Sequence, residues 1–261
     1  MQVHPNRQKW ISRRLMWVGA AVVCALLISA AIQHRKQGEI PGDTYITIRD
    51  ESELKFLNAN RVKTIIFQQL GYELKGRPLG TVDLGEVEKC LEKSPFIKDA
   101  DVYSDARNGI SIIITQRSPI VRVMQNDGTS YYLDENGIFM PSSPAFAARV
   151  PVATGYTGKF DEHYREIKGH IVADIFKLAK YITTDEFWTA QIEQIYVDNS
   201  NNLYLVPKVG DQVISFGNTE DMEDKFKRLK VFYDEALPRE GWDKYKTLSV
   251  RFKKQIIAVK R

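Results

Sequence analysis

The stretch FIKDADVYSDARNGISIIITQRSP at residues 96–119 carries the clearest secondary-structure pattern in the chain. Ala100 and Val102 alternate with polar residues in its first half. In its second half every other residue is an isoleucine, at Ile110, Ile112 and Ile114. Asn108-Gly109 stands between the halves, and this dipeptide favours a tight hairpin turn. Because alternate residues of a strand face the same side, the stretch predicts a β-hairpin with one buried face.

Two helical patterns precede this hairpin. NRVKTIIFQQLG at 60–71 repeats its apolar residues with the period of a helix. Asp83, followed three residues later by Glu86, predicts the capped start of a second helix. TYITI at 44–48 alternates like a strand. Residues 44–118 therefore predict the order strand, helix, helix, strand, strand, which is a small α+β unit with two helices on a sheet.

The pattern changes after Pro119, where residues 120–261 become rich in short strand-like runs. Apolar residues about one turn apart predict a helix over 164–182 and another over 219–236. The chain then closes with two strand-like runs, KTLSVRF at 246–252 and QIIAVK at 255–260. We expect a strand-rich β domain with two helices that ends in a hairpin.

A long apolar run lies near the N-terminus. Residues 15–32 (LMWVGAAVVCALLISAAI) carry no charge. A helix of this length measures about 27 Å, against about 30 Å for the hydrocarbon core of a membrane. Arginine and lysine precede the run without any acidic residue, and the more basic side stays in the cytoplasm. The pattern predicts a cytoplasmic tail at 1–14, a transmembrane helix at 15–32 and a polar linker at 33–43.

A cleavable signal peptide is the alternative for the same segment. Ser29, Ala30 and Ala31 are small residues of the kind found at a cleavage site. The apolar run is longer than the roughly 7–15 residues of a signal sequence, which favours a retained anchor. Both interpretations export residues 37–261.

Charge and cysteine content exclude some classes of protein. The chain carries a formal charge of +4, but six of its 37 basic residues lie within residues 1–36, which hold no acid. The exported part is therefore slightly acidic and does not resemble a nucleic-acid-binding domain. Cys24 lies in the apolar run and Cys90 in the exported part, so we expect no disulfide between them.

The sequence contains no convincing catalytic or metal-binding motif. His163, Glu166 and His170 are spaced like ligands on the predicted helix, but the HExxH pattern is absent, and we expect a solvated polar face. Asp134 and Glu135 precede Asn-Gly and fit turn chemistry better than acid–base catalysis. We therefore expect no catalytic residue, no cofactor and no metal.

The closing hairpin is the best candidate for binding. Its second strand is the last in the sequence, and a last strand often lies at a sheet edge whose N–H and C=O groups can accept another strand. Alternatively, Lys253, Lys254 and Lys260 guard this edge against unwanted pairing. The sequence leaves the two interpretations open.

Several segments resemble the bacterial cell-division family FtsQ, also called DivIB. Residues 94–123 resemble the second half of its POTRA domain, with Pro95-Phe96, the Asn-Gly turn and the exit Gln-Arg-Ser-Pro. YLDENGIFM at 132–140, VISFGNTEDMEDKFKRL at 213–229 and LSVRFKKQIIAV at 248–259 resemble segments of its β domain. Gln116 replaces the usual glutamate, and Ser249 the usual aspartate.

The resemblance implies a fold and a function. It implies a POTRA-like βααββ domain at 44–119 and a β domain at 120–261 with a partner-binding C-terminal hairpin. It implies a non-enzymatic scaffold of the divisome, anchored in the inner membrane at the septum, with its N-terminus cytoplasmic and its bulk periplasmic. The implied partners are the single-pass proteins FtsB (DivIC) and FtsL and other divisome proteins, without nucleic acid.

In the family, a partner strand adds beside the last strand of the closing hairpin. Main-chain hydrogen bonds would give affinity and side-chain pockets would select the partner. Carried onto this chain, the penultimate strand and its turn contribute Thr247, Arg251 and Phe252. The last strand contributes Lys254, Ile256, Ile257 and Ala258. Phe252 would be the aromatic anchor.

Two other functions compete with this expectation. A POTRA-containing component of outer-membrane assembly or secretion would need a C-terminal membrane barrel, for which residues 120–261 hold too few suitable strands. A secreted enzyme with an unrecognised site would need signal cleavage and a cluster of titratable groups with perturbed pKa values.

Overall fold

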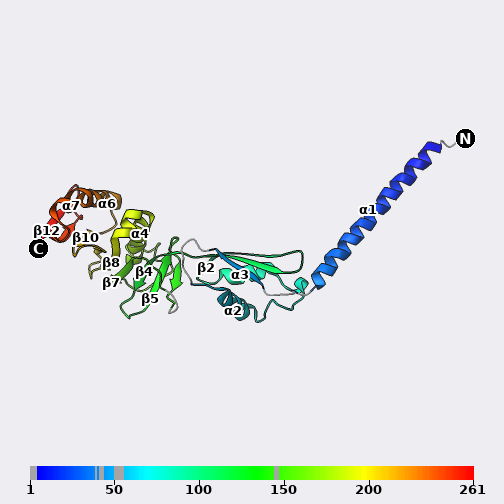
Figure 1. The fold of residues 1–261 in the computed structure, drawn as a ribbon, viewed down its shortest axis with the longest axis horizontal. Coiled ribbons are helices and arrows are strands. Elements are labelled where there is room, and N and C mark those ends of the chain that lie inside the picture. The colour runs from blue at the N-terminus through cyan, green and yellow to red at the C-terminus, as the bar shows by residue number, and fades with distance from the viewer. Residues whose placement is uncertain (1–4, 39, 41–43, 50–55, 144–146) are drawn as a thin grey trace. The chain divides into compact units, whose positions relative to one another are not determined.

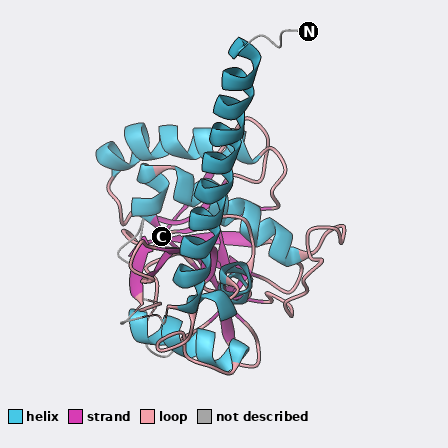
Figure 2. Ribbon diagram, turned by 90° about the vertical axis from the view of Figure 1, so that its right-hand side faces the viewer, coloured by secondary structure: helices cyan, strands magenta, loops and turns pink. Residues whose placement is uncertain are grey.

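The chain is mixed α+β, as predicted (Figures 1 and 2). The computed structural model describes residues 5–38, 40, 44–49, 56–143 and 147–261, and only the backbone of 5–15, 35 and 36. Two compact units can be distinguished. One comprises Met1–Arg49 and Leu57–Gln116, and the other comprises Asp50–Phe56 and Arg117–Arg261.

The helix α1 (Pro5–Gln37) contains the apolar run, and its segment Met16–His34 is long and apolar enough to cross a membrane (Figure 1). The side chains from Met16 to His34 are all exposed. A helix that exposes such a surface has no core of its own to join, which is consistent with a single-pass membrane anchor. The basic residues of 5–14 lie where the structure describes the backbone alone.

The predicted linker 33–43 differs from the structure in two ways. Residues 33–37 continue α1, because no glycine or proline interrupts the helix before Gly38. Ile40 is buried in the first unit, where its N–H donates to the carbonyl of Arg77 at 2.9 Å. Gly38 accepts the N–H of Leu79 at 3.0 Å. The end of this segment therefore packs onto the first unit, and residues 41–43 lie outside the described part of the chain.

The first unit is a three-stranded sheet with helices. Its elements are β1 (Tyr45–Arg49), α2 (Ala59–Leu70), the short 3-10 turn η1 (Leu79–Thr81), α3 (Leu84–Glu92), β2 (Ile97–Ser104) and β3 (Ile110–Gln116). The strand order is β1-β3-β2, with β1 parallel and β2 antiparallel to the central strand. The three alternating isoleucines of β3 are fully buried, so the predicted hairpin and its buried face are confirmed.

The start of α3 is fixed by the predicted cap. The side chain of Asp83 accepts the N–H groups of Gly85 at 3.0 Å and Glu86 at 3.2 Å. Replacing Asp83 with Ala should lower the free energy of unfolding by about 1 kcal/mol, because two helix N–H groups lose their acceptor. Urea unfolding of the full chain in detergent measures this loss. Asp83→Asn keeps one acceptor oxygen and should retain most of the stability.

The second unit is built on a nine-stranded sheet. Its strands are β4 (Pro119–Met124), β5 (Ser130–Asp134), β6 (Phe139–Pro141), β7 (Val152–Gly155), β8 (Ile192–Val197), β9 (Leu203–Pro207), β10 (Val213–Gly217), β11 (Tyr245–Ser249) and β12 (Ile257–Lys260). The order is β12-β11-β10-β9-β8-β7-β4-β5-β6. The closing hairpin therefore forms one end of the sheet.

Helices supply the other half of this core. They are α4 (Ile171–Thr184), α5 (Glu186–Gln191), α6 (Met222–Val231), a π-helical segment η2 (Phe232–Ala236) and α7 (Leu237–Glu240). Buried residues of α4 and α6, such as Leu178 and Phe226, belong to one cluster with Ile195 and Leu205 of the sheet. One face of the sheet is thereby covered, whereas Tyr196 keeps an exposed ring.

Two helix predictions are wrong in their limits. The helix expected over 164–182 begins only at Ile171, because Gly169 adopts a positive φ of 76° and His170 is extended. The Nδ1 atom of His170 accepts the N–H of Val172 at 3.2 Å and caps the helix. The helix expected over 219–236 is α-helical only from Met222 to Val231. The strand β7 and the short helix α5 were not predicted.

Candidate functional site

The strand β12 lies at the end of the nine-stranded sheet and, among the described residues, has a neighbouring strand on one side only. It pairs antiparallel with β11, with Ile257 opposite Ser249 and Ala258 opposite Leu248. A strand in this position offers main-chain groups to a further strand.

The hydrogen bonds around the hairpin show which main-chain groups of β12 face the free edge. Val250 donates its N–H to Ser215 of β10 at 3.1 Å, and Arg261 donates to Lys244 at 3.1 Å. Successive residues of a strand direct their N–H and C=O groups to opposite sides. Every second residue shares a direction, so Val259 and Ile257, like Arg261, direct their main-chain groups toward β11. Ala258 and Lys260 then direct their N–H and C=O groups to the free edge.

The side chains of β12 divide between the two faces of the sheet. Ile256 and Ala258 are partly buried against the core of the unit. Ile257 and Val259 point to the opposite face and remain 42% and 51% exposed. Val259 was not among the candidate residues, although its alternation with Ile257 in the sequence is the signal that indicates it.

The connection between β11 and β12 is longer than the sequence indicated. β11 ends at Ser249 and β12 begins at Ile257. Lys254 and Ile256, assigned to the last strand from the resemblance, therefore lie in the connection, and Lys254 adopts a positive φ of 61° that interrupts an extended strand. Phe252 also lies in the connection and is 51% exposed.

Thr247 and Arg251 lie farther from the free edge. Thr247 is half-buried between Val213 of β10 and Val259 of β12. The Arg251 Nη2 atom donates to the side-chain oxygen of Asn202, at the start of β9, at 3.2 Å. Since β9 and β12 lie on opposite sides of β11, Arg251 is directed away from the edge strand that carries Ile257 and Ala258.

The lysines beside this edge are exposed. Lys253 contacts the carboxylate of Asp221 at 3.1 Å, and both side chains are more than half exposed. Such surface ion pairs contribute about 0–1 kcal/mol, so this one does not hold the connection in place. Lys260 is exposed on the edge strand itself.

The residues considered for catalysis or metal binding, Asp134, His163 and Glu166, lie in or beside turns. Asp134 is buried, accepts the N–H groups of Asn136 and Ile138, and lies 2.9 Å from the Arg117 guanidinium, so the turn interpretation is confirmed. His163 and Glu166 lie in turns before α4, not on a helix as predicted. Within the described residues, no group of three or more His, Cys, Asp or Glu side chains could hold a metal ion.

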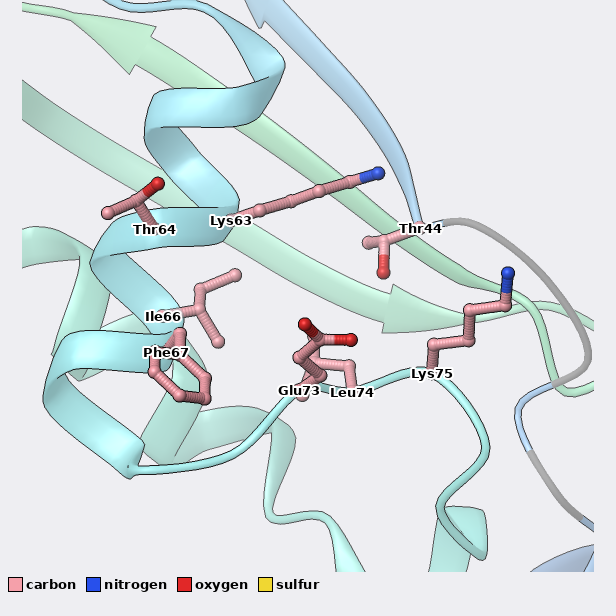
Figure 3. A pocket seen from close by; sticks show the side chains of 8 residues that line it. All are labelled: Thr44, Lys63, Thr64, Ile66, Phe67, Glu73, Leu74 and Lys75. Atoms are coloured by element: carbon pink, nitrogen blue, oxygen red, sulfur yellow. The ribbon is translucent and has the colours of Figure 1, made fainter.

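The first unit contains a pocket of about 470 Å³ beside α2 (Figure 3). It is lined by Thr44, Lys63, Thr64, Ile66, Phe67, Glu73, Leu74 and Lys75. In Figure 3, the side chain of Glu73 lies beside that of Leu74, with Lys63 above it and Lys75 to its right. The described residues of this lining mix both charge signs with apolar side chains.

Both units match families of known proteins. Residues 118–259 match the family described as "FtsQ/DivIB, C-terminal related". Residues 42–115 match the POTRA-like domain. The first match covers more than half of the chain.

Two curated relatives have the same description. The "Cell division protein FtsQ" of Geobacter sp. (strain M21) is 27% identical over 162 residues, covering 60% of this chain and 57% of that protein. The "Cell division protein FtsQ" of Myxococcus fulvus (strain ATCC BAA-855 / HW-1) is 25% identical over 103 residues, covering 39% of this chain and 36% of that protein. The matches thus span little more than half, and about a third, of these relatives.

Proposed function

We propose, since this chain belongs to the FtsQ/DivIB family, that it is a non-enzymatic, membrane-anchored scaffold of cell division. Residues 1–14 form its cytoplasmic tail, 15–32 its transmembrane helix, 44–119 its POTRA-like domain and 120–261 its β domain. The names of the relatives and the separation of two compact units near residue 117 support this arrangement.

The scaffold binds its partner by strand addition at β12. The observation that carries this proposal is the position of β12 at the end of the sheet, with Ala258 and Lys260 directing main-chain groups outward. An extended partner segment would form a tenth strand through N–H···O=C bonds. Its side chains on the outer face would lie beside Ile257 and Val259, which favours apolar residues at alternate positions.

The partners are proposed to be FtsB/DivIC-like and FtsL-like single-pass proteins. The protein would be recruited to the septum together with other divisome proteins, in the inner membrane. The basic residues before the apolar run support a cytoplasmic N-terminus and a periplasmic location for both units.

The anchor proposal makes a direct prediction. The full chain should sediment with membranes and resist extraction at high pH, because about 20 apolar residues partition stably into a bilayer. Mass spectrometry of the isolated protein should recover peptides from before Met16. A soluble mature protein beginning near Gln33 would instead establish the signal-peptide alternative.

Phe252 tests the binding proposal through a side chain. Phe252→Ala should weaken the binding of a purified FtsB-type partner about tenfold, since an exposed aromatic residue at the centre of an interface contributes about 1–2 kcal/mol. Titration of the full chain in nanodiscs measures the Kd. The control is Tyr156→Ala, which removes an exposed ring (53%) elsewhere in the same unit and should leave the Kd unchanged. If Phe252→Ala binds the partner as tightly as Tyr156→Ala, Phe252 does not belong to the interface.

The alternative role in outer-membrane assembly or secretion has less support. The nine described strands of the second unit form an open sheet with β12 and β6 at its ends. In the first unit, one of the outward N–H groups of the edge strand β2, that of Val102, is already accepted by the Glu88 carboxylate of α3 at 2.9 Å. A client strand at this edge would have to displace Glu88, so β12 is the more accessible edge of the two.

A further inference from the structure

Three main-chain carbonyls of the connection between β11 and β12 accept hydrogen bonds from one side chain of another element. Arg228 lies near the end of α6, and its side chain is only 16% exposed. Its Nη1 atom donates to the carbonyls of Phe252, at 2.9 Å, and Gln255. Its Nη2 atom donates to the carbonyl of Val250 at 3.2 Å. One guanidinium thus binds the beginning, the middle and the end of the seven-residue connection.

The guanidinium is itself held in orientation. Its Nε atom donates to the Asp224 carboxylate at 2.9 Å, one helical turn earlier on α6. A planar group with five donors can serve several acceptors at once, whereas a lysine ammonium is a compact point charge on a flexible stem. Other contacts also reach the connection: the Val250 N–H bonds to Ser215, Arg251 bonds to Asn202, and Lys253 forms a solvent-exposed ion pair with Asp221 at the N-cap of α6. Among the described residues, Arg228 donates more hydrogen bonds to this segment than any other side chain.

We propose that Arg228 is the positioning residue of the binding edge: it fixes the β11–β12 connection and so presents β12 ready for strand addition. This inference rests on the proposed function. An edge strand that is already ordered loses little conformational freedom when a partner binds, whereas a loose hairpin must be ordered in each binding event. The role of Arg228 is thus exerted through main-chain carbonyls and requires no contact with the partner.

The test compares Arg228→Met and Arg228→Lys with the control Lys230→Met. Lys230 lies on the same helix but pairs with Asp234 at 2.7 Å and lies over the ring of Phe187. Its replacement removes the same charge without touching the connection. For each full-length variant in nanodiscs, amide hydrogen exchange of residues 250–261 and the Kd for the purified single-pass partner are measured.

Arg228→Met should accelerate exchange in residues 250–256 and weaken partner binding about tenfold, while exchange in α4 and β8 stays unchanged. Arg228→Lys should be intermediate in both measurements, and Lys230→Met should match the wild type. If Arg228→Met unfolds the whole unit, exchange and Kd are compared between Arg228→Lys and Lys230→Met instead.

Two results would overturn the proposal. Unchanged exchange at residues 250–256 in Arg228→Met would show that the guanidinium does not fix the connection. Accelerated exchange with an unchanged Kd would show that fixing it does not serve binding. Failure of the proposed function is distinguishable, because the wild type would then bind no partner while the exchange difference could still be measured.

Discussion

Ala258→Pro should nearly abolish partner binding while the nine-stranded sheet stays folded. Ala258 directs its N–H to the free edge, so a proline there removes no bond to β11. Proline is tolerated on edge strands for this reason. The partner strand, in contrast, loses the N–H of residue 258 as a hydrogen-bond donor and meets the proline ring. Two or three main-chain hydrogen bonds are lost, namely the one from Ala258 and neighbouring ones that the ring displaces; at about 1 kcal/mol each they correspond to binding weaker by about 30- to 150-fold.

The matched control is Ala258→Val, which enlarges the side chain but keeps the N–H group. Because the Ala258 side chain packs partly against the core, this variant reports any effect of added volume. We expect it to bind within about threefold of the wild type, a difference of about 0.6 kcal/mol. The Kd values are measured on the full chain, with circular dichroism as the check on folding. A folded Pro variant that binds like the wild type would place the partner elsewhere.

Local sequence patterns predicted the first unit well because its contacts are close in the sequence. The connection between β2 and β3 spans residues 105–109, with the Asn108 N–H donating to the Asp105 carbonyl at 3.4 Å, so the turn lies earlier and is longer than the predicted Asn108-Gly109 turn. Asn108 adopts a positive φ of 63° at its end. The alternation of Ile110 and Ile112 reports a single buried face. Asp83 caps its helix through N–H groups two and three residues away.

The second unit was predicted less completely because its sheet depends on distant pairings. β7 lies parallel between β4 and β8, and β10 lies parallel to β11, so the strand order is not the sequence order. The apolar spacing that begins at Ile167 continues into α4 and suggested one long helix. Gly169 overrides that periodicity, and Ile167 remains 43% exposed.

The candidate site shows the same limit. The sequence could indicate that the last strand lies at a sheet edge. It could not indicate that Arg251 points toward Asn202, because this direction depends on the neighbouring strands. Arg228 was not among the candidate residues. Its three carbonyl contacts arise because Arg228 and the β11–β12 connection, more than twenty residues apart in sequence, meet in the fold.

Gly155→Ala should destabilise the second unit by about 3 kcal/mol or more, because two separate penalties combine. Gly155 ends β7 with a φ of 87°, a conformation that an L-residue with a side chain rarely adopts. A Cβ atom there would lie 2.1 Å from the carbonyl oxygen of Val197 and 2.9 Å from the Tyr196 ring. That carbonyl already accepts the N–H of Tyr156 at 3.0 Å, so moving it disturbs the pairing of β7 with β8.

Gly128→Ala separates the two penalties. Gly128 has a φ of 84°, but a Cβ atom there would meet nothing within 4 Å. Its replacement should cost only the backbone strain, about 1 kcal/mol. Urea unfolding of the full-length variants, followed by tryptophan fluorescence, measures both losses. Equal losses of unfolding free energy in the two variants would mean that β8 shifts at little cost to accommodate the added Cβ atom. A much larger loss for Gly155→Ala is expected, because β7 joins the β4–β6 part of the sheet to the β8–β12 part.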